Sequence, residues 1–157
     1  MKMEETIVTA YGPLRIRHDG KRINSIEFLW KAAPGMGEKN GPLASRFGKQ
    51  LDEYSKGIRK NFNVEFLPLP KGTDFQEKVW KITSKIPYGK TITYKNIAEK
   101  LGNPKLARAV GNAMKANRLP FIIPCHRVVA ENGLGGYAGK EGMSTKRKLL
   151  LLEKSAR

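Results

Sequence analysis

Leu119-Pro120-Phe121-Ile122-Ile123-Pro124-Cys125-His126-Arg127-Val128-Val129 is an apolar run that ends in a thiol, an imidazole and a guanidinium. Pro120 and Pro124 disfavour helix at the residues before them, so we expect a short, extended and buried segment. Such a rigid base would hold the Cys125 sulfur in place, and polar neighbours can ionise it to the attacking thiolate. A single cysteine is also commonly a small buried hydrophobe. This stretch alone leaves both interpretations open.

Cysteine and histidine are scarce in this chain. The 157 residues include one Cys and two His, which excludes an internal disulfide and argues against a four-ligand zinc site. A hydrophobic content of 39% is enough for a core. No run approaches the roughly 20 apolar residues that span a membrane, and no signal peptide opens the chain. We therefore expect a protein of one or two small lobes in a reducing compartment, cytoplasmic, or nuclear if the source has a nucleus.

The net charge is strongly positive and unevenly distributed. Thirty Lys and Arg against 14 Asp and Glu give +16. Residues 1–70 hold 12 basic and 8 acidic side chains, whereas residues 71–157 hold 18 and 6. A basic lobe favours a polyanionic partner through phosphate contacts and counterion release. A lysine-rich solubilising surface is the alternative.

The first part of the chain has the pattern of a small sheet followed by a helix. Residues 5–30 are predicted to form antiparallel strands, with a hairpin at Asp19-Gly20. The last of these strands is predicted from alternating apolar residues that end at Trp30. His18 is interpreted as a strand residue near the surface. Helical spacing follows in the apolar residues Leu43, Phe47, Leu51, Tyr54 and Ile58. Residues 64–67 could add a strand, and residues 68–72 are the best linker candidate, so we predict lobes at 1–70 and 71–157.

The second lobe has the pattern of a helix-turn-helix. Thr73 and Gln76 form a capping box that starts a first helix. Two short helices are then predicted on either side of Gly102-Asn103-Pro104. Outward positions of the second helix include Lys105, Arg108, Asn112 and Lys115. An ordinary pair of antiparallel helices fits this pattern equally well, and the local charge favours DNA.

The end of the chain combines a glycine-rich loop with a final helix. Five glycines in residues 132–142 can bring backbone N–H groups close to a ligand, although a flexible connection has the same composition. Ser144 is predicted to cap the last helix, which residues 149–152 would pack against the core. Glu153 near the end of that helix opposes the helix dipole, so a specific partner for it is expected, a solvated glutamate being the alternative.

The order of these motifs closely resembles the O6-alkylguanine-DNA alkyltransferases, a family of direct-reversal DNA repair proteins. The shared residues are Ile-Pro-Cys-His-Arg-Val at 123–128, Thr-Tyr at 93–94, Ala-Arg-Ala-Val-Gly at 107–111, Asn117, Gly-Gly-Tyr at 135–137 and the leucine-rich helix ending in Glu153. They span residues 71–157, while residues 1–70 match only in layout. The resemblance implies an α+β fold. Its N-terminal lobe has a small antiparallel sheet plus helix in a ribonuclease H-like layout, and its mostly helical C-terminal lobe has a winged-helix-like helix-turn-helix.

The resemblance also implies a reaction. Cys125 would be the nucleophile that removes an alkyl group from guanine O6, and because the thioether is not hydrolysed each molecule would react once. His126 is implied to take the thiol proton through a water, and Glu153 to orient the imidazole. Tyr94 would donate towards the base, and Lys146 would support the departing oxygen.

Further residues are implied to hold the base and the DNA. The base pocket would comprise Val128, Gly136, Tyr137, Ala138 and Asn117. The DNA contacts would be Arg108, Tyr94, Thr93, Ala107, Ala109, Gly111, Lys105, Met114 and Lys115. In the family the helix-turn-helix enters the minor groove, and an arginine, here Arg108, fills the gap left by the flipped nucleotide. The implied partner is double-stranded DNA containing O6-alkylguanine, bound by a monomer that contacts no membrane, with no cofactor and no metal.

Three other functions compete with this one. A lesion-binding relative without transfer activity would keep the helix-turn-helix and Arg108 but lack the acceptor cysteine. A helix-turn-helix transcription factor explains the basic lobe but gives the Pro-Cys-His-Arg segment no role. A cysteine hydrolase is disfavoured because the sequence shows no evident acyl pocket. Retention of Cys125 together with His126 and Glu153 favours the alkyltransferase.

Overall fold

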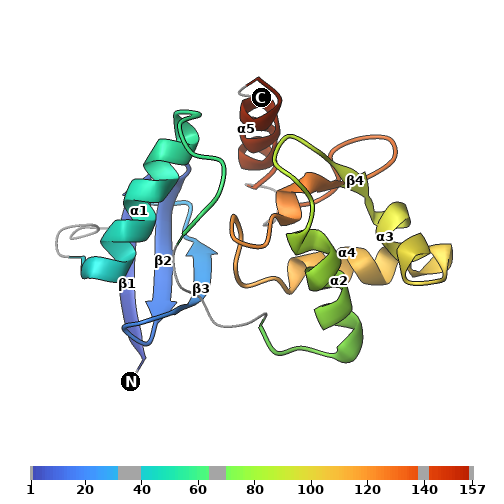
Figure 1. The fold of residues 1–157 in the computed structure, drawn as a ribbon, viewed down its shortest axis with the longest axis horizontal. Helices are drawn as coiled ribbons and strands as arrows, with labels where there is room; N and C mark the ends of the chain where they lie inside the picture. The colour runs from blue at the N-terminus through green and yellow to red at the C-terminus, as the bar shows by residue number, and fades with distance from the viewer. Residues whose placement is uncertain (1, 32–39, 64–69, 138–141, 156–157) are drawn as a thin grey trace. The chain divides into compact units, whose positions relative to one another are not determined.

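The computed structural model describes residues 2–31, 40–63, 70–137 and 142–155. The chain divides into two compact units, Met1–Pro68 (unit 1) and Leu69–Arg157 (unit 2), whose elements are coloured along the chain in Figure 1. The possible strand at 64–67 and the first part of the predicted linker lie outside the described residues. Strands gather in unit 1 and helices in unit 2, and the predicted α+β class is confirmed.

Unit 1 is a three-stranded antiparallel sheet in contact with one helix. The strands β1 (Met3–Thr9), β2 (Gly12–His18) and β3 (Ile23–Phe28) lie in the order β1-β2-β3, and α1 (Pro42–Ser55) contacts β1 (Figure 1). Apolar and basic residues alternate along β2, so one face of this strand is buried and the other is exposed. Leu14 and Ile16 are fully buried with residues of α1, whereas Arg15 pairs with Glu4 and Glu27 at 3.1 Å each. The predicted strands and their turns are confirmed.

Three details of unit 1 differ from the predictions. His18 is buried rather than near the surface, because its Nε2 lies 2.5 Å from Glu5 Oε2 and its Nδ1 accepts from the Gly20 N–H. Ile58 lies beyond the end of α1 and is 71% exposed, so the helical stripe ends at Tyr54. Trp30 follows β3 with a φ of 63°, which takes it out of the strand.

Unit 2 contains the predicted helix-turn-helix. Its elements are α2 (Asp74–Ser84), β4 (Ile92–Thr93), α3 (Tyr94–Lys100), the 3₁₀ turn η1 (Pro104–Leu106), α4 (Ala107–Lys115), the 3₁₀ turn η2 (Cys125–Arg127), β5 (Val128–Val129) and α5 (Gly142–Ser155). The capping box at Thr73 is confirmed, and a second one, at Thr93 with Asn96, starts α3. Helix α4 contacts both α2 and α3, and the buried Trp80 Nε1 donates to the Ala113 carbonyl at 2.8 Å.

The segment before the thiol is a turn, so the predicted extended conformation is wrong. The Ile123 N–H donates to the Leu119 carbonyl at 2.8 Å, and Phe121 closes this turn with a φ of 72°. Proline excludes helix at the residue before it but does not exclude a tight turn. Phe121 and Ile123 are buried as predicted, so this turn still forms an apolar base for the residues that follow.

Helix α5 begins three residues earlier than predicted and buries less of its leucine run. It starts at Gly142, which places Ser144 inside the first turn rather than at the cap. Leu149 is fully buried, whereas Leu151 is 60% exposed, because consecutive residues of a helix point in different directions. Among the residues described, no helix is both long enough and apolar enough to cross a membrane.

Candidate active site

Cys125 lies in unit 2, where two short segments meet. It opens η2, directly before β5, and β5 pairs in parallel with β4 through Ile92–Val128 and Thr93–Val129. Asn117, after α4, fixes the preceding turn: its side chain donates to the Ile123 carbonyl at 3.1 Å and accepts from the Leu119 N–H at 3.0 Å. The thiol is thereby held on a backbone that is hydrogen-bonded on both sides.

The Cys125 thiol is protonated in the resting protein. The residue is 9% exposed, and burial raises the pKa of the Cys125 thiol above its ordinary value. A hydrogen bond from the Asn117 side chain and the charge of Lys146 lower this pKa, but they do not overcome burial. Ionisation of the thiol by polar neighbours therefore stays a prediction: Asn117 and Lys146 act in that direction, and burial acts against it. Ionisation has to accompany proton transfer to a base.

His126 is buried beside Glu153, which is the partner predicted for that carboxylate. The His126 Nε2 lies 2.8 Å from Glu153 Oε2, and both side chains are 1% exposed. Burial lowers the pKa of His126, although the Glu153 carboxylate raises it, so the imidazole is neutral at rest. Because an ionised carboxylate only accepts, Nε2 carries the proton and Nδ1 has the free lone pair. Among the described residues Nδ1 has no hydrogen-bond partner.

Arg127 is a site residue that the sequence argument missed. Its Nε donates to Glu153 Oε1 at 2.8 Å and its Nη2 donates to Glu153 Oε2 at 2.9 Å. Its Nη1 donates to the Ile86 carbonyl at 2.7 Å, and the Gly89 N–H donates to Glu153 Oε1 at 3.3 Å. The position of Arg127, next to His126 in a basic lobe, is the only sequence signal, and it does not distinguish a buried arginine from a DNA contact.

Tyr94 is the first residue of α3 and packs tightly against the glycine-rich segment. A Cβ at Gly135 would lie 2.6 Å from the Tyr94 hydroxyl, and Gly135 has a φ of 72°, so only glycine fits both demands. The hydroxyl donates to the Gly136 carbonyl at 3.5 Å. Burial raises the pKa of Tyr94, although the hydrogen bond to Gly136 lowers it. The phenol is therefore a protonated donor at neutral pH.

Lys146 is fully buried and donates to two backbone carbonyls. Its Nζ lies 2.7 Å from the Val128 oxygen and 3.0 Å from the Gly136 oxygen. The ammonium also lies 5.8 Å from the centroid of the Tyr94 ring. Burial lowers the pKa of Lys146 to about 8. Lys146 thus joins β5 to the glycine-rich segment, where the prediction had placed it beside the departing oxygen.

The structure brings two of the predicted pocket residues, Val128 and Gly136, together. Lys146 links Val128 to Gly136, and Tyr94 also contacts Gly136. Tyr137 is buried. Ala138 lies outside the described residues.

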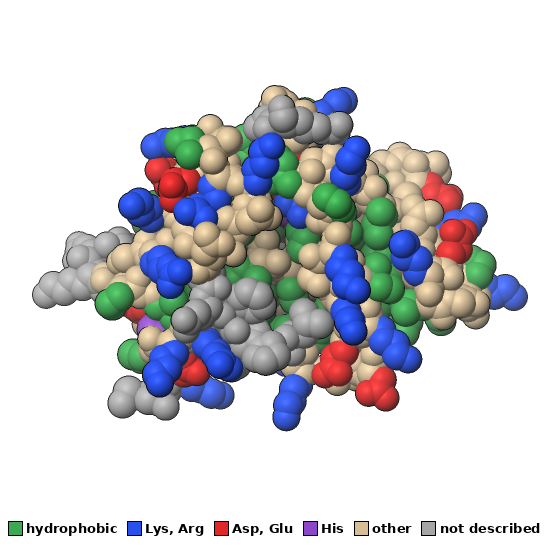
Figure 2. Space-filling view, in the orientation of Figure 1, with side chains coloured by type: hydrophobic (Ala, Val, Ile, Leu, Met, Phe, Trp, Pro, Cys, Tyr) green, Lys and Arg blue, Asp and Glu red, His purple; other side chains and the backbone are tan. Residues whose placement is uncertain are grey.

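The predicted DNA contacts divide into exposed and buried residues. Arg108, Lys105 and Lys115 are exposed on η1 and α4, while Ala107, Ala109 and Gly111 are partly exposed. Thr93 caps α3 through its side chain. Met114 is buried, and Thr83 Oγ1 lies 3.8 Å from its sulfur, so we remove it from the predicted DNA contacts. Figure 2 shows Lys and Arg side chains dispersed across the visible face rather than gathered in one patch.

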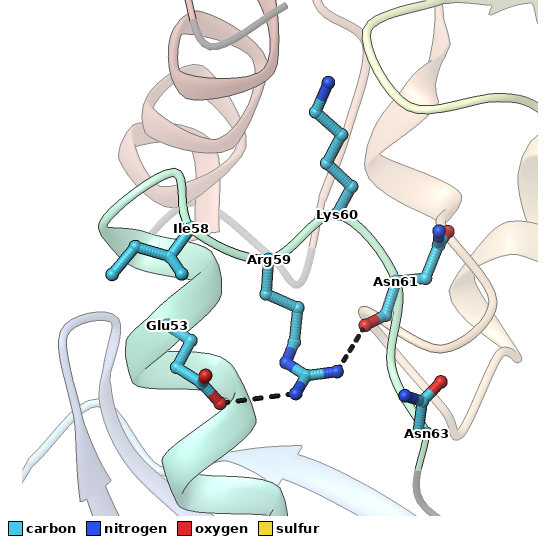
Figure 3. Close-up of a pocket in the computed structure, with 6 residues that line it drawn as sticks. All are labelled: Glu53, Ile58, Arg59, Lys60, Asn61 and Asn63. Atoms are coloured by element: carbon cyan, nitrogen blue, oxygen red, sulfur yellow. Dashed lines mark hydrogen bonds and ion pairs between the residues drawn. The ribbon is translucent and has the colours of Figure 1, made fainter.

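A separate hollow of about 370 Å³ lies in unit 1, away from the cysteine in the chain. It is lined by Glu53, Ile58, Arg59, Lys60, Asn61 and Asn63 (Figure 3). Arg59 crosses it, pairing with Glu53 at 3.3 Å and donating to the Asn61 carbonyl at 3.1 Å. The hollow is open and polar, and the Glu53 carboxylate in its lining is paired with Arg59.

Comparison with known proteins agrees with this geometry. The family model described as "6-O-methylguanine DNA methyltransferase, DNA binding domain" matches residues 74–155. A methylated-DNA–protein-cysteine methyltransferase of Methanosarcina acetivorans is 39% identical, with 92% of this chain and 93% of the relative covered. A constitutive one of Bacillus subtilis is 42% identical, with 90% and 89% covered.

Solved structures show the same similarity. The crystal structure of the Mycobacterium tuberculosis O6-methylguanine methyltransferase has a TM-score of 0.83 and 38% identity, covering 100% of this chain and 95% of the other. A structure of the Mycobacterium tuberculosis protein in complex with DNA has a TM-score of 0.82, covering 98% and 93%. The chain belongs to the methylated-DNA–protein-cysteine methyltransferase family.

Proposed function

We propose that this protein repairs O6-alkylguanine in double-stranded DNA by moving the alkyl group to Cys125. The sulfur attacks the alkyl carbon, so an S–C bond forms as the C–O6 bond breaks, and guanine leaves. The thioether is stable, so each molecule reacts once and needs no cofactor. The observation that carries this proposal is the buried Cys125 beside the His126–Glu153 pair, in a chain of this family.

The proton of the thiol is proposed to move to His126. Nδ1 is the basic nitrogen, because Nε2 carries the proton that it donates to Glu153. Transfer would pass through one water from Sγ to Nδ1, and the Glu153 carboxylate would stabilise the imidazolium that forms. Since burial raises the pKa of the thiol, the thiolate would form as its proton moves to His126.

The departing purine is proposed to take a proton from Tyr94. The phenol is protonated, and its hydrogen bond to the Gly136 carbonyl is long, at 3.5 Å. Exchange of that bond for one to the base would cost little. Lys146 would keep the Val128 and Gly136 carbonyls in place during the exchange. Its role is therefore to shape the pocket, and Asn117, Tyr137 and Ala138 would complete the wall.

The helix-turn-helix is proposed to bind the minor groove and to extrude the nucleotide. A base inside a duplex cannot reach a buried sulfur, so the nucleotide has to leave the stack. Arg108 is exposed on α4 and would fill the gap, flanked by the small residues Ala107, Ala109 and Gly111. Lys105 and Lys115 would contact phosphates, and Thr93 would orient Tyr94. The Mycobacterium tuberculosis relative has been crystallised in complex with DNA. We propose that this chain binds DNA as a monomer, with unit 1 as its supporting lobe.

The test of this function is the intact mass of the protein after incubation with an O6-methylguanine duplex. We expect a gain of one methyl group per molecule, mapped to the peptide that contains Cys125, and no further gain with excess duplex. Unmodified protein that still retains the duplex would favour the lesion-binding alternative. An undamaged duplex of the same sequence is the control.

Arg108→Ala is expected to slow alkyl uptake from duplex DNA far more than uptake from free O6-benzylguanine. Extrusion costs a few kcal/mol, and loss of the residue that fills the gap should slow the duplex reaction by about tenfold or more. The free base needs no extrusion. Lys105→Ala is the matched control, because this exposed residue precedes α4 and should weaken binding without changing the rate at saturating duplex. Equal slowing on both substrates would contradict a flipping role for Arg108.

Duplex affinity is expected to fall steeply with salt. Neutralisation of about 4–6 phosphates gives a slope of about −4 to −5 for log affinity against log salt. Fluorescence anisotropy of a labelled undamaged duplex at several salt concentrations measures this slope. Lys115→Ala should reduce its magnitude by about 1 if that side chain contacts a phosphate. An affinity that does not change with salt would show that the positive side chains of unit 2 do not contact the DNA phosphates.

A further inference from the structure

We propose that Arg127 is a positioning residue for His126. Its guanidinium binds both oxygens of Glu153, and so fixes the direction and the strength of the hydrogen bond that Glu153 accepts from the imidazole. This inference rests on the proposed function, in which His126 takes the thiol proton. It assigns to Arg127 a task that the proposed mechanism does not otherwise require.

The carboxylate of Glu153 is held in a two-point contact. Nε lies 2.8 Å from Oε1 and Nη2 lies 2.9 Å from Oε2. Two parallel N–H bonds fix the plane of a carboxylate, which a single donor cannot do. Because His126 Nε2 lies 2.8 Å from the same Oε2, the orientation of the imidazole depends on the orientation that Arg127 gives to Glu153.

Arg127 is itself anchored by the segment that follows α2. Its Nη1 donates to the Ile86 carbonyl at 2.7 Å, and its guanidinium carbon lies 5.7 Å from the centroid of the Tyr88 ring. The Gly89 N–H donates to Glu153 at 3.3 Å. A guanidinium does not lose its proton in proteins, so the Glu153 carboxylate faces a positive charge at every working pH. The anchored charge is therefore permanent.

The shared oxygen also limits how strongly Glu153 can hold a protonated His126. Oε2 accepts from Arg127 and His126 together, so neither receives the whole of its charge. The charged groups that act on the imidazole are the Glu153 carboxylate, the Arg127 guanidinium and the Lys146 ammonium, with Tyr88 beyond Arg127. Burial and the two cations lower the pKa of His126, while Glu153 raises it. The imidazole is thus kept neutral and able to accept a proton.

Replacement of Arg127 by methionine tests this inference. We expect the His126–Glu153 pair to take up a proton at a pH higher by about one unit or more, because a nearby like charge is removed. Heteronuclear NMR of the ring nitrogens gives the midpoint, and the only other histidine, His18 in unit 1, is the internal reference. Alkyl uptake by this variant should fall more at pH 6 than at pH 8. Arg118→Met removes an exposed arginine of the same unit and should leave the midpoint unchanged.

Arg127→Lys separates charge from geometry. Lysine keeps the positive charge but cannot bind both oxygens in a fork. We expect a midpoint close to that of the unmodified protein, with alkyl uptake slower by roughly tenfold or more at every pH, since small misplacements of a reacting group are costly. This variant decides the question if the methionine variant does not fold.

Two results would overturn the inference: an unchanged His126 midpoint in folded Arg127→Met, or full activity of Arg127→Lys at every pH. The titration needs no DNA. It therefore remains decisive even if the unmodified protein takes up no alkyl group, an outcome that would refute the proposed function alone.

Discussion

Cys125→Ala is expected to take up no alkyl group from an O6-methylguanine duplex while it still binds that duplex. Cys125 is the only cysteine of the chain, so no second thiol can replace it. The substitution removes one buried sulfur and should cost only about 1 kcal/mol of folding stability. Because the exposed residues of α4 are unchanged, duplex affinity measured by anisotropy should stay close to that of the unmodified protein.

Cys125→Ser is the companion variant for this experiment. It keeps a hydroxyl nucleophile of similar size, but a serine hydroxyl is far less easily ionised than a thiol and is a weaker nucleophile towards an alkyl carbon. We expect intact mass to show no uptake for either variant over a period in which the unmodified protein reacts completely. An alkylated alanine variant would place the acceptor elsewhere. Loss of duplex binding in both variants would instead show that the thiol contributes to recognition.

Glu153→Ala is expected to destabilise unit 2 by about 3–5 kcal/mol, because it leaves a buried guanidinium without its partner. The change removes four contacts at once: one to His126, two to Arg127 and one to Gly89. Urea denaturation followed by circular dichroism measures the loss. Alkyl uptake under native conditions should also fall, since the imidazole loses the group that orients it.

Two variants provide the comparison for Glu153. Asp52→Ala removes an acid that pairs with Lys56 at 2.9 Å on the surface of α1, and exposed pairs contribute about 1 kcal/mol or less. Glu153→Gln keeps the shape of the side chain but not its charge, so we expect it to lose alkyl uptake with a smaller loss of stability than Glu153→Ala. If Glu153→Ala cost no more than Asp52→Ala, the buried network would contribute little to the fold.

Short-range sequence signals predicted the helices of the site but only some of the hydrogen bonds between its side chains. The capping box at Thr73 and the Gly-Asn-Pro break located the helices, because these signals act over a few residues. The unfavourable place of Glu153 at a helix end indicated a partner, and His126 is that partner. Arg127 was missed because its partners, Ile86 and Glu153, are distant in sequence and only the folded chain brings them together.

The errors at other positions have related causes. Pro120 and Pro124 were taken to extend the chain, but a hydrogen bond from Ile123 to Leu119 closes a turn there instead. Met114 was placed on the DNA face from the family pattern, although it packs beside Thr83. The support of the departing oxygen by Lys146 stays a prediction, and the structure adds two backbone carbonyls as partners of its ammonium. In each instance a tertiary contact decides between conformations that the local sequence leaves equally open.

The short parallel pair of β4 and β5 has a mechanical consequence. Thr93 both caps the helix that begins with Tyr94 and pairs with Val129, which follows the sulfur by four residues. Two residue pairs, Ile92–Val128 and Thr93–Val129, therefore join the start of α3 to the strand that follows the reactive cysteine. A displacement of the start of α3 is therefore expected to move the Cys125 segment with it.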